Sequence, residues 1–146
     1  MKAAPRVPAQ ALIEFTMPGD PVAWARAGRG GTTTYTQPRQ AAYARSLGWA
    51  AKAVMKGAGP LAGPVSLTVQ ATYTVPTSWP QAKKLAAVFK PSVADLDNIV
   101  KQVSDALNKI AYADDAQICQ IIAMKVYGPV AQVFVRVEPL IHGEIN

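Results

Sequence analysis

Residues 95–117 read DLDNIVKQVSDALNKIAYADDAQ, with aspartates both before and after a helix's length of sequence. The whole chain has nine acidic residues, and five of them lie in this stretch: Asp95, Asp97, Asp105, Asp114 and Asp115. Carboxylates gathered at one place repel each other, so they usually need a cation to hold them together. Oxygen ligands suit magnesium, which proteins normally hold through one or two carboxylates together with phosphate and water. The stretch therefore predicts a metal site.

The charge of the chain is unevenly distributed around this stretch. The formal net charge is +6 at pH 7, yet the first 90 residues contain only two acids, Glu14 and Asp20. A basic first part joined to an acidic second part fits a polyanion that is bound by one and acted on by the other. Solubility is the alternative explanation of the same charge. An acidic metal site in a basic protein points to an enzyme that cuts or transfers phosphodiesters.

Composition narrows the class of protein. A length of 146 residues with 50% hydrophobic content indicates one folded domain over 11–146, preceded by a flexible arm, residues 1–10, that is rich in Ala and Pro. The single cysteine, Cys119, excludes an internal disulfide, and one cysteine with one histidine argues against a zinc site. No segment resembles a signal peptide or a membrane span, so we expect a cytoplasmic location and no membrane partner.

Two main helices are predicted from the spacing of apolar residues. Residues 38–57 combine Pro38 in the first turn with apolar positions at helical spacing. Residues 98–110 carry an apolar stripe along one side, with Asp97 as the predicted N-cap. A short helix is predicted over 80–87. These helices supply the predicted cover for a sheet.

Four strands are predicted, over residues 11–17, 65–72, 117–127 and 130–137. The last two are expected to form a hairpin at Gly128-Pro129, and residues 22–36 to form a flexible basic loop. The order of elements predicts an α+β fold: a single small domain in which a mixed or antiparallel sheet of about four strands packs with two main helices.

The aspartates that flank the second helix have two explanations. Aspartates at the start of a helix usually cap it and favour the positive end of its dipole. Lys101 lies four residues after Asp97, however, so both side chains reach the same side of the helix. A lysine beside a metal site can neutralise a phosphate or the charge on a leaving oxygen. For Asp114 and Asp115 the alternative to a metal site is a simple turn.

A set of motifs extends through these residues: Asp95-Leu96-Asp97-Asn98, Lys101, Asp105-Ala106-Leu107, Asp114-Asp115-Ala116-Gln117 and Lys125, preceded by Pro18-Gly19-Asp20-Pro21. In residue type and spacing it resembles the RusA family of four-way (Holliday) junction resolvases, small endonucleases common in phages and prophages. The resemblance covers nearly all of the chain beyond the first ten residues.

The resemblance implies roles for individual residues. It implies that Asp95, Asp97 and Asp115 hold magnesium, for which Mn²⁺ is expected to substitute, and that Lys101 is the basic residue of the active centre. Three further residues are secondary candidates. Asp114 is the neighbour of Asp115, and Lys125 is expected close by on the following strand. Lys90 precedes Pro91, but residues 92–94 separate this pair from Asp95, whereas the family has the acid straight after the proline. The resemblance also implies a homodimer and no organic cofactor.

The residues and the resemblance together predict a magnesium-dependent, structure-selective endodeoxyribonuclease that resolves four-way DNA junctions by paired phosphodiester hydrolysis in recombination and repair. Four arginines are candidates for binding DNA phosphates: Arg26, Arg29, Arg39 and Arg45. Trp24, Tyr35 and Trp79 are candidates for stacking on bases, with ordinary packing as the alternative for each.

Two other functions fit the same residues. One is a less selective metal-dependent DNA nuclease, which would cut linear duplex as readily as a junction. The other is a non-catalytic DNA-binding protein in which the acids only cap helices, and which would bind DNA regardless of magnesium. The clustering of scarce acids favours an enzyme over the second of these.

Overall fold

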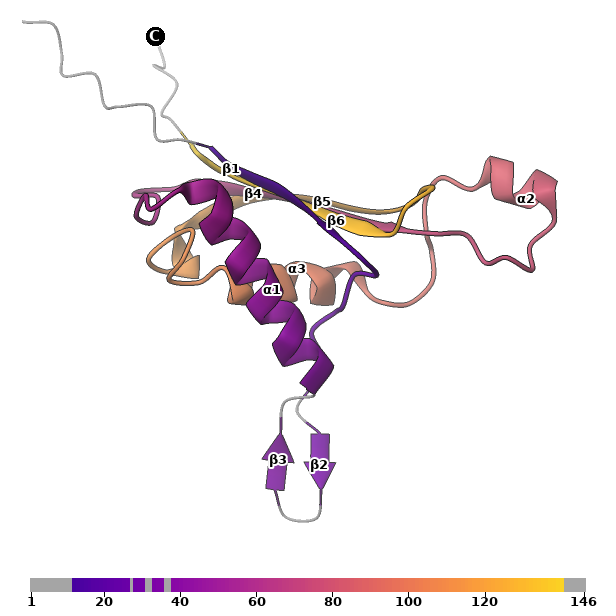
Figure 1. Ribbon diagram of the computed structural model, residues 1–146, viewed down its shortest axis with the longest axis horizontal. Helices are drawn as coiled ribbons and strands as arrows, with labels where there is room; N and C mark the ends of the chain where they lie inside the picture. Colours follow the sequence, from indigo (N-terminus) through magenta and orange to yellow (C-terminus); the bar gives the residue numbers. More distant parts are fainter. Residues whose placement is uncertain (1–11, 27, 31–32, 36–37, 141–146) are drawn as a thin grey trace, which may run out of the picture.

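The computed structural model describes residues 12–26, 28–30, 33–35 and 38–140, so the predicted arm over 1–10 lies outside the described residues. A mixed four-stranded sheet carries two main helices on one face, and a third, short helix lies beyond one end of the sheet (Figure 1). In chain order the elements are β1 (Ile13–Pro18), β2 (Gly28–Gly30), β3 (Thr33–Tyr35), α1 (Pro38–Met55), β4 (Val65–Tyr73), α2 (Gln81–Ala86), α3 (Leu96–Ala106), the 3₁₀ turn η1 (Asp115–Gln117), β5 (Ile118–Tyr127) and β6 (Gln132–Pro139). The predicted α+β class is confirmed.

The sheet has the strand order β1-β6-β4-β5. Strand β6 pairs antiparallel with both β1 and β4, whereas β4 and β5 run parallel. In β4, Val65, Leu67, Val69 and Ala71 are fully buried because alternate side chains of a strand point to one face, and here that face lies under the helices. Because β4 is paired on both sides, its backbone hydrogen bonds are made within the sheet.

The predicted hairpin between the last two strands is wrong, because β4 lies between β5 and β6. The connection after β5 instead crosses the end of β4, where the Gly128 N–H donates a 2.9 Å hydrogen bond to the Tyr73 carbonyl. A Cβ on Gly128 would lie 2.7 Å from Thr72 Cγ2, so glycine permits this close crossing. The turn residues that favour a hairpin therefore serve a different connection.

Helices α1 and α3 close the core over one face of the sheet. Leu47 and Ala51 of α1 are fully buried, as are Val103 of α3 and Leu107 just after it. Helix α1 confirms the prediction closely, whereas α3 starts earlier than expected and ends at Ala106, before the predicted end. The chain turns after α3, and the buried side chains of Ala111 and Tyr112 continue the core.

The region predicted as a basic loop contains regular structure. Strands β2 and β3 form a two-stranded antiparallel ribbon that projects away from the sheet (Figure 1). The glycines and threonines of this segment carry no alternation of apolar and polar residues, so periodicity gave no sign of the strands. Within the described ranges, no helix combines the length and the apolar character needed to cross a membrane.

Candidate active site

The aspartates at the start of α3 differ from the prediction in their helix positions. Asp95, rather than Asp97, is the N-cap residue, and its side chain makes no capping hydrogen bond. Asp97 lies in the first turn, where its Oδ1 accepts a 3.0 Å hydrogen bond from the Asn98 N–H. Both residues are exposed. The start of α3 therefore leaves the Asp95 carboxylate available, and the helix dipole favours negative charge at this end.

An open pocket of about 540 Å³ lies against α3 and β5. Its lining residues come from α3, from β5 and from the turn between them: Leu96, Asp97, Val100, Lys101, Ser104, Asp105, Asp115, Ile121 and Ala123. The fold thus brings Asp97, Lys101 and Asp115 to one pocket, although they come from two separate parts of the chain. Asp95 lies next to this pocket along the chain but does not line it.

The predicted set of three metal ligands is not assembled in this conformation. Among the residues that the structure describes, no group of three or more His, Cys, Asp or Glu side chains could hold a metal ion together. The donor chemistry of the pocket nevertheless suits magnesium, because magnesium is usually bound through only one or two protein carboxylates, with phosphate and water completing its shell. Asp97 and Asp115 supply that number of carboxylates.

The neighbouring acids Asp114 and Asp115 have different surroundings. Asp114 is the N-cap of η1: its Oδ1 accepts a 2.9 Å hydrogen bond from the Ala116 N–H, and the Gln117 side chain caps in return. Gln117 also donates from Nε2 to the carbonyls of Leu61 and Gly63, each at 2.9 Å, which fixes the turn to the core. Asp114 therefore has a structural task, whereas the Asp115 carboxylate does not cap the turn.

The protonation of these two acids is linked. The Ala116 N–H, and next the side chain of Asp115, lower the pKa of Asp114. The hydrogen bond with Asp114, followed by partial desolvation and the charges of Asp114 and Asp105, raises the pKa of Asp115, and the charge of Lys101 opposes this rise. Asp115 thus lies in an excess of negative charge, which a bound cation would relieve.

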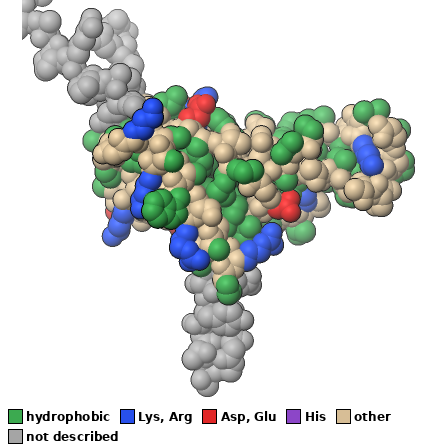
Figure 2. Space-filling model, in the orientation of Figure 1, with side chains coloured by type: hydrophobic (Ala, Val, Ile, Leu, Met, Phe, Trp, Pro, Cys, Tyr) green, Lys and Arg blue, Asp and Glu red, His purple; other side chains and the backbone are tan. Residues whose placement is uncertain are grey.

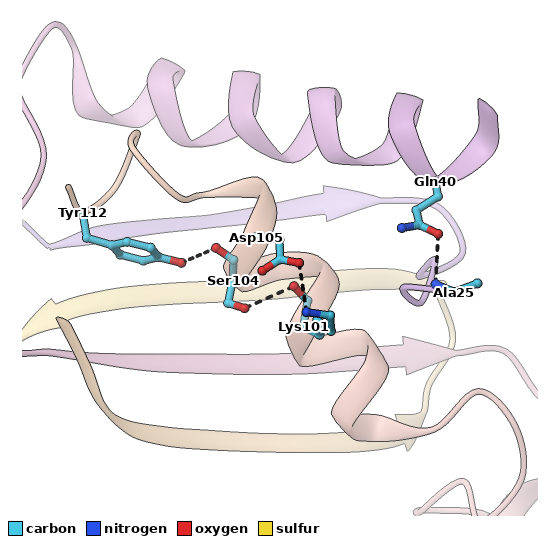
Figure 3. A network of polar contacts seen from close by, with 6 residues as sticks. All are labelled: Ala25, Gln40, Lys101, Ser104, Asp105 and Tyr112. Carbon is cyan, nitrogen blue, oxygen red and sulfur yellow. Dashed lines mark hydrogen bonds and ion pairs between the residues drawn. The ribbon is translucent and has the colours of Figure 1, made fainter. Parts of the chain in front are cut away.

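Lys101 is held in place on the same side of α3 as the acids. Its Nζ lies 3.4 Å from Asp105 Oδ2, an ion pair between residues one helical turn apart that is drawn in Figure 3. Its ammonium also lies 4.9 Å from the centroid of the Trp24 indole, a cation–π contact. Trp24 is itself fixed to the start of α3, because its backbone N–H donates a 2.9 Å hydrogen bond to the Asn98 carbonyl. Trp24 therefore supports the lysine.

Two buried glutamines connect the segment of Trp24 to the helices. Gln40 of α1 accepts a 2.9 Å hydrogen bond at Oε1 from the Ala25 N–H, as Figure 3 shows. Gln102 of α3, only 2% exposed, donates from Nε2 to the Gln40 carbonyl at 2.8 Å. Through these bonds to backbone groups, the two glutamine side chains fix both helices relative to the segment of Trp24.

We expect the substitution Gln40→Ala to lower the free energy of unfolding by about 1–3 kcal/mol, because it leaves the Ala25 N–H without its acceptor. Urea denaturation followed by circular dichroism measures this change. Gln81→Ala, at the exposed start of α2, is the matched control and should change the free energy by less than about 0.5 kcal/mol. Equal effects of the two substitutions would contradict a stabilising role for the buried pair.

The secondary candidates Lys90 and Lys125 bind the backbone that leads into α3. Lys125 Nζ on β5 donates to the carbonyls of Ser92 and Ala94, both at 2.6 Å. Lys90 Nζ donates to Ser92 Oγ at 2.8 Å and to the Val93 carbonyl. Both lysines therefore hold the segment before Asp95, and neither lines the pocket.

The predicted DNA-binding arginines are spread over two regions. Arg26 is exposed just before the ribbon, and Arg39 and Arg45 are exposed on α1. The side chains of Arg29 and Tyr35 lie outside the described structure. Trp79 packs edge to face on Tyr127, with ring centroids 5.4 Å apart, so for this residue packing accounts for its position.

Sequence reasoning missed the glutamines that position the site. Gln102 lies three residues after Ile99 and beside Val103, inside the apolar stripe of α3. An amide in such a stripe indicates that it has a hydrogen-bond partner in the interior. For Trp24 the sequence predicts base stacking or ordinary packing, and no pattern in the chain indicates that it reaches Lys101.

Two comparisons with known proteins show which family the chain belongs to. A family model described as endodeoxyribonuclease RusA matches residues 18–138, which include every residue that lines the pocket. Over 135 residues the chain is 30% identical to the uncharacterized protein YqaN of Bacillus subtilis (strain 168), a match that covers 85% of this chain and 95% of YqaN. The protein belongs to the RusA family of endodeoxyribonucleases.

Proposed function

We propose that this protein resolves four-way DNA junctions by magnesium-dependent hydrolysis of paired phosphodiesters during DNA recombination and repair. The observation that carries the proposal is the open pocket against α3 and β5, which Asp97 and Asp115 line together with Lys101. Carboxylates beside an ammonium suit the metal-dependent hydrolysis of a phosphodiester, because the carboxylates can bind a metal ion and the ammonium can neutralise the phosphate. The family to which the chain belongs consists of endodeoxyribonucleases.

We assign the metal to Asp97 and Asp115, with Asp95 joining them when DNA is bound. The support is that Asp95 makes no capping hydrogen bond and that the pKa of Asp115 is raised by the hydrogen bond with Asp114 and by nearby negative charge. When bound, magnesium lowers the pKa of a water molecule and stabilises the charge that develops on the phosphate.

The other residues of the pocket orient and neutralise the DNA. Lys101 carries a positive charge toward the phosphate, and its contacts with Asp105 and Trp24 limit the positions that its ammonium can reach. The apolar side chains of Ile121 and Ala123 form the β5 side of the pocket.

We also propose that two copies form a symmetric dimer. A four-way junction has two strands to cut, and a two-fold dimer presents two equivalent pockets to them. The support in the fold is the edge strand β5, which presents exposed apolar side chains at Ile122 and Met124, outside the pocket. Exposed apolar edge strands commonly pair with another chain.

One cleavage experiment tests the function. We expect a mobile four-way junction to be cut in Mg²⁺ and left intact in EDTA. Ca²⁺ should support binding without cutting, because its looser coordination misplaces the attacking water. Linear duplex of the same sequence should be cut at least about a hundredfold more slowly, and light scattering should give a mass of about twice 15.5 kDa.

Each arm of this experiment has a contrary outcome. Equal cutting of junction and duplex would favour the less selective nuclease. Tight binding that is indifferent to magnesium, with no product, would favour a non-catalytic DNA-binding protein. A mass of 15.5 kDa at assay concentrations would remove the dimer from the proposal.

A further inference from the structure

Trp49 is the unusual residue on the exposed side of α1. Its side chain is 69% exposed, although tryptophan is among the most buried residue types on average. It lies four residues after Arg45 and three before Lys52, so the three side chains share one side of the helix. The Lys52 Nζ lies 5.2 Å from the centroid of the indole. An exposed aromatic ring with a cation on either side along the helix is complementary to a ligand that has both a flat apolar face and negative charge.

A hollow lies directly beside this residue. A cavity of about 370 Å³ between α1 and α3 is lined by Ala44, Arg45, Gly48, Trp49, Lys52, Asp105, Ala106 and Ile110. Small side chains keep it open, and a Cβ on Gly48 would lie 3.0 Å from Ile110 Cδ1. The helices can therefore approach closely at Gly48 while the space next to Trp49 stays accessible. Figure 2 shows Lys and Arg side chains beside hydrophobic surface over the part of the molecule where α1 lies.

This hollow adjoins the candidate active site. Asp105 lines both the hollow and the pocket that contains Asp97 and Asp115. The charge of Asp105 is partly compensated by its ion pair with Lys101, so it repels an approaching phosphate less than a free carboxylate would. Because Asp105 lines both hollows, the side of α1 that carries Trp49 adjoins the pocket in which a DNA strand would be cut.

We propose that Trp49, Arg45 and Lys52 form a stacking platform for an unpaired nucleotide of the DNA strand that is cut, an inference that rests on the proposed function. The indole stacks on the base and the two cations contact the flanking phosphates. Such stacking tolerates any base, because every base has a flat face. The platform would give the enzyme a preference for DNA whose bases are already exposed, as at the centre of an opened junction.

A second copy of the chain fits this surface less well than DNA does. Helix α1 contains three basic residues and no acidic one, so the charge that this helix contributes to the surface is positive. A two-fold contact centred on Trp49 would bring Arg45 and Lys52 of both copies together, and like charges in contact disfavour association. The charge is complementary to a polyanion instead.

The substitution Trp49→Ala tests the platform. We expect it to weaken binding of a four-way junction, measured in Ca²⁺, by about tenfold, and binding of linear duplex by less than about twofold. Trp49→Phe, which keeps a flat ring, should restore junction binding to within about threefold of the original. Because Trp49 is exposed, both variants should have an unchanged unfolding midpoint. Equal losses on junction and duplex, or a loss of dimer mass in Trp49→Ala, would overturn the platform.

A direct measurement separates this inference from the proposed function. A short oligothymidine should quench the tryptophan fluorescence of the unmodified protein without any metal, and this quenching should be largely absent in Trp49→Phe. Arg45→Ala should lower the slope of log affinity against log salt by about one unit for the same oligonucleotide. Quenching that persists in Trp49→Phe overturns the platform even if junctions are cut. Quenching that depends on Trp49 supports it even if the preferred substrate is not a junction.

Discussion

Asp97→Asn should bind a four-way junction with the affinity of the unmodified protein and cut it about a thousandfold more slowly. The amide keeps the Oδ1 that accepts the Asn98 N–H, so the start of α3 is preserved. Only the negative charge toward the pocket is lost. Single-turnover cleavage in Mg²⁺ measures the rate, and titration in Ca²⁺ measures binding.

The matched control is Asp20→Asn, which removes an exposed acid that lines a different cavity, together with Arg39 and Lys90. It should leave the cleavage rate within about twofold, since it lies outside the pocket. If Asp97→Asn still nicked the junction in Mg²⁺ at close to the original rate, Asp97 would have no part in the chemistry. A loss of binding in parallel with a loss of cutting would instead show that the residue serves affinity.

Asp115→Asn and Asp114→Asn should differ strongly although the residues are neighbours. We expect Asp115→Asn to slow cleavage by about a hundredfold to a thousandfold, because the carboxylate that lines the pocket loses its charge. Asp114→Asn should stay within about threefold. Asparagine is as good an N-cap as aspartate, and its side-chain oxygen can still accept from the Ala116 N–H. Rates measured with saturating enzyme test both.

Stability provides the control for this pair. Both asparagine variants should unfold within about 0.5 kcal/mol of the unmodified protein, whereas Asp114→Ala, which cannot cap, should be destabilised by about 1 kcal/mol. The assignment fails if Asp114→Asn is the slow enzyme and Asp115→Asn the normal one. It also fails if the two are slowed equally at full stability, because then neither would be distinguished as the ligand.

The sequence predicted the helices and strands well wherever apolar spacing is regular. The helix over 38–57 and the strand over 65–72 correspond to α1 and β4 almost residue for residue. The pairing between strands was not predicted correctly. The turn residues Gly128-Pro129 predicted a hairpin, yet which strand inserts at the centre of a sheet depends on contacts between distant segments, and no local pattern encodes them.

The candidate site was predictable in its residue types and less so in its arrangement. The cluster of scarce acids predicted a metal site, and the resemblance to the RusA family implied Asp95, Asp97, Asp115 and Lys101. All of these except Asp95 line one pocket. The residue pattern alone could not separate Asp114, which caps η1, from Asp115, which lines the pocket, because the two are adjacent and of the same type. Nor could it foresee that Lys125 binds backbone carbonyls, since the position of a long flexible side chain is decided by tertiary contacts.

The grip of Gln117 on the carbonyls of Leu61 and Gly63 makes an outlying bend of the chain an accessory to the chemistry. Gly63 adopts a φ of +72°, which few other residues tolerate, so a bulkier replacement there would distort the bend. Because the Gln117 side chain binds this bend, the distortion would also displace Asp115, which lies two residues before Gln117. A substitution at this bend would then reduce activity by displacing the Asp115 carboxylate, even though it lies outside the pocket and the overall fold is unchanged.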